Sequence, residues 1–145
     1  MNDCGPILLA EDDENDALIF RTALKKADIP NALTHVLDGQ GAINYLAGVG
    51  SYSNRAQYPL PCLVVTDLKM PRTTGFDLLA WIKNQLPPNC PPVVVLSGSP
   101  EQSDKERAFG LGAAAYFVKP SGLEHMIHLA QELKDTWLAP LSRPV

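Results

Sequence analysis

The sequence has no excess of basic residues, few cysteines and no long apolar run. Its 145 residues carry a net charge of −4, without the cationic stripe that neutralises nucleic-acid phosphates, so direct nucleic-acid binding is not expected. No apolar run approaches the ~20 residues of a spanning helix, and the first residues, MNDCGP, are unlike a signal peptide. We therefore expect a cytoplasmic protein that does not enter a membrane.

The three cysteines, Cys4, Cys62 and Cys90, are an odd number and show no C-x-x-C spacing. They predict neither a disulfide framework nor a zinc site, and we interpret them as reduced thiols. His125 and His128 lie three residues apart, but no cysteine or further histidine completes a transition-metal site. We interpret the two histidines as partly exposed helix residues.

The sequence does contain several short, uniformly apolar segments. With 46% hydrophobic residues, we expect one domain over residues 1–145, with a short tail from about residue 138. The segments are ILLA (7–10), CLVVTD (62–67), VVVLS (93–97) and AAAYFVK (113–119), with a weaker fifth, ALTHVL (32–37). Because they lack polar alternation, they are typical of strands buried on both faces of a parallel sheet.

Stretches with helical spacing alternate with these strands. Their apolar residues include Ala17, Phe20, Leu24 and Ala27, then Phe76, Leu79 and Ile82, and finally Leu123, Met126, Ile127, Ala130, Leu133 and Trp137. Another helix is expected at Ser103, which can form a capping box with Glu106. The alternation predicts an α/β fold with a doubly wound, five-stranded parallel sheet and five helices. Residues 47–61, rich in Gly, Ser, Asn and Pro, predict an exposed loop.

In such a sheet, polar residues at the carboxyl ends of the strands gather along one edge. Asp12 and Asp13 follow the first strand, Asp67 ends the third, Ser97 ends the fourth and Lys119 ends the fifth. We therefore expect these five side chains to converge.

Carboxylates without cysteine or nearby histidine favour a hard cation, and Mg²⁺ is the natural choice. Such a cation would also let an anionic phosphoryl donor approach Asp67, whose carboxylate can attack phosphorus and form an aspartyl phosphate. Phosphoryl transfer requires mainly positioning and charge stabilisation. Lys119 can pair with one phosphoryl oxygen, and the Ser97 hydroxyl can hydrogen-bond another.

The same residues also have ordinary structural interpretations. An aspartate at a strand end is often a helix cap, and Asp13 is well placed to cap the first helix. We interpret Glu11 as a solvated or packing residue outside the site. The joint placement of polar residues at the ends of four strands favours a functional site.

Four segments, AEDDEND, VVTDLKMPRTTGFDLL, VVVLSGS and GAAAYFVKP, closely resemble motifs of the receiver domains of two-component response regulators. The resemblance covers nearly the whole chain and implies a flavodoxin-like strand order of 2-1-3-4-5. It implies that Asp67 is the phosphoacceptor and that Ser97 and Lys119 contact the phosphoryl group. In the same way it implies a switch role for the Tyr116 ring and a cis peptide between Lys119 and Pro120.

The implied metal site consists of Asp12, Asp13, Asp67 and the backbone carbonyl of Lys69. A lysine at position 69 departs from the smaller or uncharged residues frequent in the family, which leaves the phosphoryl lifetime open.

The resemblance also implies partners. A sensor histidine kinase or phosphotransfer protein would donate the phosphoryl group, and a downstream protein or a second copy of the chain would recognise the switched state. The chain looks like a stand-alone receiver without an effector domain, a signalling protein whose only chemistry is its own phosphoryl transfer and dephosphorylation. The loop at 47–61 and the tail containing Trp137 resemble the subgroup that partners phytochrome-type histidine kinases.

Three other functions fit parts of the pattern. A phosphatase of the haloacid-dehalogenase type also forms an aspartyl phosphate, but its D-x-D motif is absent because residue 69 is Lys. A flavodoxin would have a Ser/Thr- and Gly-rich phosphate loop where EDDEND stands. A receiver-like interaction module that is never phosphorylated would not need the complete acidic site.

Overall fold

The computed structural model describes residues 5–86 and 91–138. Within them the strands are β1 (Ile7–Ala10), β2 (Leu33–Val36), β3 (Leu63–Thr66), β4 (Val93–Ser97) and β5 (Ala115–Val118). The helices are α1 (Glu14–Lys26), α2 (Gly39–Ala47), α3 (Gly75–Gln85), α4 (Gln102–Gly110) and α5 (Leu123–Leu133), with a 3-10 helix η1 (Gly50–Tyr52) and a π-helical turn η2 (Lys134–Leu138). The strands pair in parallel in the order β2-β1-β3-β4-β5, which confirms the predicted fold.

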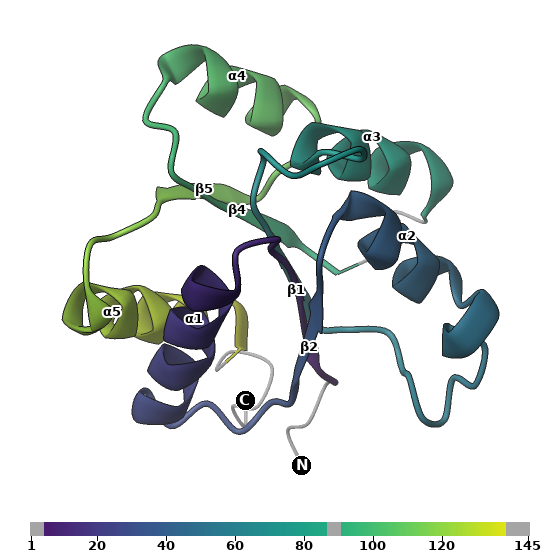
Figure 1. Cartoon of the computed structure of the whole chain (residues 1–145), viewed down its shortest axis with the longest axis horizontal. Helices are drawn as coiled ribbons and strands as arrows, with labels where there is room; N and C mark the ends of the chain where they lie inside the picture. The colour runs from purple at the N-terminus through teal and green to yellow at the C-terminus, as the bar shows by residue number, and fades with distance from the viewer. Residues whose placement is uncertain (1–4, 87–90, 139–145) are drawn as a thin grey trace.

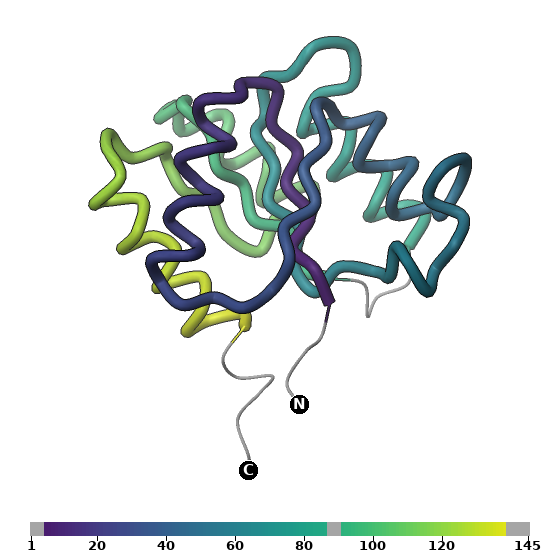
Figure 2. The backbone as a smooth tube through the Cα atoms, turned by 60° about the horizontal axis from the view of Figure 1, so that its bottom comes forward, coloured from purple at the N-terminus to yellow at the C-terminus, as the bar shows by residue number. Residues whose placement is uncertain are grey.

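The central strands β1, β3 and β4 are buried throughout because helices cover both faces of the sheet. Figure 1 shows α1 and α5 on one face and α2, α3 and α4 on the other. Figure 2 shows α1 and α5 side by side from another direction. Successive strand residues face opposite sides, so Leu9 packs in the core beneath α1 with Phe20, whereas Leu8 packs beneath α2 with Tyr45.

The register of the sheet brings the strand ends to one level. The last residues of β1 and β3 pair, so the residues that follow them, Glu11 and Asp67, are neighbours. The ends of β4 and β5 also pair, and the Lys119 backbone N–H donates to the Ser97 carbonyl oxygen at 2.7 Å. The predicted edge therefore collects residues from four strands.

The start of α4 differs from the sequence prediction. Glu101 is its N-cap residue, without a side-chain capping hydrogen bond, and Ser103 lies inside the first turn. The hydroxyl of Ser99 fastens this end of the helix, because it donates to the Asp104 carboxylate at 2.6 Å and accepts from the Glu101 N–H at 3.3 Å. The predicted capping box at Ser103 is therefore wrong.

The predicted loop between α2 and β3 is mostly exposed but is anchored to α2. Three tyrosine rings pack together: the ring centroid of Tyr52 lies 5.0 Å from that of Tyr45 and 5.2 Å from that of Tyr58, and the centroids of Tyr45 and Tyr58 lie 6.2 Å apart. Arg55 donates to the carbonyl oxygens of Leu46 at 2.7 Å and of Tyr58 at 2.9 Å. These contacts join the middle of the loop to the last turn of α2.

Cys62 is buried, and its sulfur accepts a hydrogen bond from the Asn31 amide at 3.3 Å. Cys4, Cys90 and the predicted tail beyond residue 138 lie outside the described residues. His125 and His128 are exposed on α5, as predicted. In the segments that the structure describes, every helix is too short or too polar to cross a bilayer.

Gly75 begins α3 in close contact with the loop that follows β3. An added Cβ would lie 2.8 Å from the Leu68 Cα and closer still to the Asp67 carbonyl oxygen. Because both are backbone atoms, we expect Gly75→Ala to lower the free energy of unfolding by about 1–3 kcal/mol, measured by urea denaturation. At Gly110 an added Cβ meets nothing within 4 Å, so the control Gly110→Ala should be neutral or slightly stabilising. Equal losses in the two variants would contradict this account.

Candidate functional site

Asp67 lies directly after β3 and is only 7% exposed. Its Oδ1 accepts from the Leu68 N–H at 2.6 Å and from the Lys69 N–H at 3.4 Å. Its Oδ2 lies 2.8 Å from Lys119 Nζ. Backbone N–H groups therefore fix one oxygen of the Asp67 carboxylate, while the other oxygen faces the Lys119 ammonium.

The Lys119 ammonium lies among three carboxylates. Its Nζ is 2.8 Å from Glu11 Oε1, 2.7 Å from Asp16 Oδ2 and 2.8 Å from Asp67 Oδ2. Burial by itself lowers the pKa of Lys119, but hydrogen bonds to Asp16, Asp67 and Glu11 outweigh it and raise this pKa above its usual value. Three carboxylates occupy the three donors of an ammonium, so Lys119 stays protonated.

Glu11 belongs to this site, contrary to its interpretation as a solvated or packing residue. Its side chain is 4% exposed, and its Oε2 accepts from the Asp13 N–H at 3.0 Å. Burial raises the pKa of Glu11, while the hydrogen bonds from Lys119 and Asp13 oppose the rise. That interpretation was wrong because the pairing of β1 with β3 places Glu11 beside Asp67.

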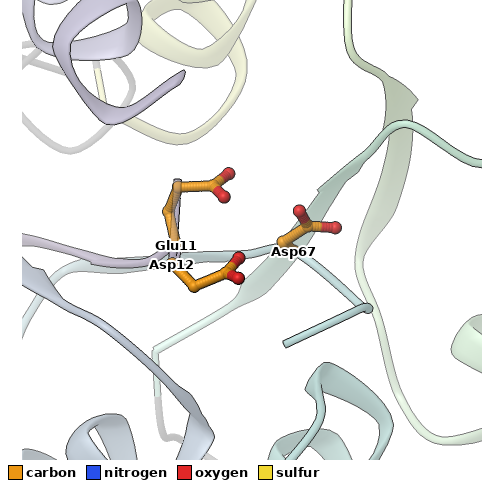
Figure 3. Close-up of side chains that lie close together, drawn as sticks. All are labelled: Glu11, Asp12 and Asp67. Atoms are coloured by element: carbon orange, nitrogen blue, oxygen red, sulfur yellow. The ribbon is translucent and has the colours of Figure 1, made fainter. Parts of the chain in front are cut away.

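Glu11, Asp12 and Asp67 form a carboxylate cluster. One oxygen of each lies within 4.8 Å of the others, and Figure 3 shows the three groups projecting from the ends of β1 and β3. Glu11 and Asp67 are buried, whereas Asp12 is exposed. Three clustered carboxylates fit a hard divalent cation such as Mg²⁺. Among the described residues, no cysteine or histidine joins this cluster.

Asp13 has a different place. It is the N-cap residue of α1, and its Oδ1 accepts from the Asp16 N–H at 3.0 Å. The alternative interpretation of Asp13 as a helix cap is therefore confirmed. Its carboxylate is not one of the three in the cluster.

Ser97 and Tyr116 are connected through Ser99. The buried Ser97 hydroxyl accepts from the Ser99 N–H at 3.2 Å, and the Tyr116 hydroxyl donates to the Ser99 carbonyl oxygen at 2.8 Å. Since the Ser99 hydroxyl also donates to Asp104 of α4, Ser99 joins the site to a helix. Sequence reasoning missed Ser99, although its place two residues beyond Ser97 was a usable signal.

The peptide between Lys119 and Pro120 is trans, as are all the described peptide bonds, so the predicted cis bond is wrong. Lys119 reaches the site without it, because its backbone continues β5 and hydrogen-bonds to Ser97. An open pocket of about 440 Å³ adjoins the Lys119 side chain and is also lined by Asp16, Asp67, Lys69 and Ser97. Of the predicted strand-end residues, Asp67, Ser97 and Lys119 therefore face a common space with the exposed Lys69, whereas Asp12 and Asp13 do not line this pocket.

The site is centred on a buried aspartate at the carboxyl edge of a 2-1-3-4-5 parallel sheet. The profile of the response regulator receiver domain family matches residues 7–131. The chain belongs to this family of two-component signalling.

Individual relatives agree with this assignment. The chain is 31% identical over 138 residues to Response regulator Rcp1 of Synechocystis sp., covering 95% of this chain and 92% of the relative. The phosphorylated cyanobacterial phytochrome response regulator RcpA has a TM-score of 0.83 at 30% identity, covering 94% of this chain and 95% of that one. The Mn²⁺-bound form of Rcp1 has a TM-score of 0.81 at 31% identity, covering 97% and 99%. The chain is therefore a receiver domain related to phytochrome response regulators.

The separate places of Asp12 and Asp13 generate a prediction. Asp12→Asn should weaken binding of Mg²⁺ or Mn²⁺ at least about tenfold, because it removes a carboxylate from the cluster. Asp13→Asn removes the same charge one residue away and keeps a good N-cap, so it should change the affinity less than about twofold. Calorimetric titration of the two variants measures the difference. A larger loss for Asp13→Asn would return Asp13 to the ligand set.

Proposed function

We propose that Asp67 accepts a phosphoryl group from a phosphohistidine of a sensor histidine kinase or phosphotransfer protein. The observation that best supports this proposal is that the Asp67 carboxylate is buried, with one oxygen held by backbone N–H groups and the other facing Lys119. A carboxylate oxygen of Asp67 attacks phosphorus, the O–P bond forms as the N–P bond breaks, and the imidazole keeps the electron pair and takes up a proton.

We propose Glu11, Asp12, Asp67 and the Lys69 carbonyl as the residues that hold Mg²⁺. Bound there, the cation would neutralise charge on the carboxylates and on the incoming phosphoryl group. The clustered carboxylates and the Mn²⁺-bound form of the relative Rcp1 support this proposal. Asp13 is left out of the set because its carboxylate caps α1.

Lys119 and Ser97 are proposed to contact the phosphoryl oxygens. The Lys119 ammonium already lies 2.8 Å from the accepting carboxylate. The Ser97 oxygen accepts from the Ser99 N–H, which leaves its own proton available for donation. Both side chains would therefore favour the charged, phosphorylated form.

The relationship to Rcp1 and RcpA supports a phytochrome-type kinase as the donor. A cytoplasmic location belongs to the same proposal, because a histidine kinase draws its phosphoryl group from intracellular ATP. Transfer to Asp67 and hydrolysis of the aspartyl phosphate by water, which releases inorganic phosphate and restores the carboxylate, would be the only chemistry of the chain, so it acts as a signalling protein.

Asp67→Asn keeps the shape of the side chain but loses the nucleophilic charge. With acetyl phosphate and Mg²⁺, the wild-type protein should gain one phosphoryl group by intact-mass analysis, and Asp67→Asn should gain none. The control Asp28→Asn changes an exposed aspartate in the left-handed region, which asparagine also adopts, and should behave as the wild type. Equal phosphorylation of the Asp67→Asn protein would remove Asp67 as the acceptor.

We also propose that the phosphorylated state is transmitted through Ser97, Ser99 and Tyr116 to α4, β5 and α5. Drawing the Ser97 hydroxyl toward the phosphoryl group would disturb its bond with Ser99, to which Tyr116 and α4 are tied. A small change at the site would then bias a two-state element. A downstream protein or a second copy of this chain would recognise the altered face.

Amide hydrogen exchange tests this transmission, with beryllofluoride and Mg²⁺ standing in for the phosphoryl group on Asp67. Exchange should change from Ser99 to the end of α5, residues 99–133, in the wild-type protein and remain as in the apo state in Asp67→Asn. Changes limited to the loops that touch the ligand would contradict the switch while leaving the acceptor site intact.

A further inference from the structure

Asp16 makes a contact that the proposed chemistry does not use. Its Oδ2 lies 2.7 Å from Lys119 Nζ, as close as the carboxylates of Glu11 and Asp67. It stands in the first turn of α1, where its backbone N–H is held by the Asp13 cap. Its side chain is 39% exposed and lines the pocket beside Asp67.

The three partners of Lys119 are not equivalent. Glu11 and Asp67 belong to the carboxylate cluster, so a divalent cation there would compete with Lys119 for both. Asp16 lies outside that cluster and would keep its contact with the ammonium. Of the three carboxylates, that of Asp16 would therefore be the one that stays in contact with Lys119 when a divalent cation occupies the cluster.

A phosphoryl group on Asp67 needs at least one donor of the Lys119 ammonium. All three donors are engaged by carboxylates in the present structure, and a cation that drew Glu11 and Asp67 away would leave Asp16 bound to the ammonium. By holding the ammonium, the Asp16 carboxylate competes with the phosphoryl oxygens for the same positive charge.

We infer that Asp16 is a positioning residue that holds Lys119 back from the phosphoryl group and so lowers the affinity of the site for it. The inference rests on the proposed function of Asp67. Because the Asp16 side chain is partly exposed, its ion pair contributes little to the stability of the fold. Its effect should therefore be found in ligand affinity.

Calorimetric titration with beryllofluoride in saturating Mg²⁺ tests the role of Asp16. Asp16→Asn should bind beryllofluoride about threefold to fivefold more tightly than the wild type, the range of a partly exposed charge contact. The control Glu14→Gln removes the same charge from an exposed position in the same turn and should bind as the wild type. Mg²⁺ alone should bind Asp16→Asn and Glu14→Gln equally, because neither residue belongs to the cluster.

Repeating the titration in the Lys119→Met variant separates an effect of Asp16 that acts through Lys119 from direct repulsion between the Asp16 carboxylate and the anionic beryllofluoride. In Lys119→Met, adding Asp16→Asn should leave beryllofluoride affinity unchanged, since the ammonium that Asp16 restrains is gone. A gain of equal size in both backgrounds would overturn the inference in favour of repulsion. If Asp16→Asn binds beryllofluoride with the same affinity as the wild type, the role of Asp16 is overturned but the proposed function of Asp67 is not. If the wild-type protein binds no beryllofluoride, the proposed function is overturned as well.

Discussion

The acidic edge of this domain depends on one ammonium group. Two like charges ~5 Å apart at an effective dielectric of ~20 repel by roughly 3 kcal/mol, so Glu11, Asp16 and Asp67 would destabilise one another without a counterion. Lys119 lies 2.7 to 2.8 Å from all three. Because β5 ends level with β4, its backbone delivers this lysine to the centre of the acids. The contact with Lys119 therefore offsets the cost of burying the Glu11 and Asp67 carboxylates next to each other.

The loops around the site are tied to the helices by short polar contacts. After β3, Arg72 pairs with Asp38 at 2.6 Å, and Asp38 also caps α2. After β4, Ser99 contacts Ser97 through its N–H and α4 through its hydroxyl. These contacts join the carboxyl edge of the sheet directly to α2 and α4.

Local sequence patterns predicted the starts of some helices incorrectly. The pattern at Ser103 and Glu106 predicted a capping box that does not form, whereas Thr74 and Asp77 form one at the start of α3 without having been singled out. The two patterns are chemically similar. They differ because the chain entering α4 is fastened at Ser99, so that the helix begins before Ser103.

The sequence by itself determined the sheet, the alternation with helices and the convergence of Asp67, Ser97 and Lys119, because uniformly apolar strands must be buried and parallel strands end along one edge. Only the tertiary structure decided which neighbouring acids face that edge. Glu11 enters the site, Asp13 turns to cap α1, and Asp16 reaches Lys119 from the helix. In a short turn from strand to helix, each side chain's direction depends on backbone dihedrals and strand register, which a run of similar acids does not encode.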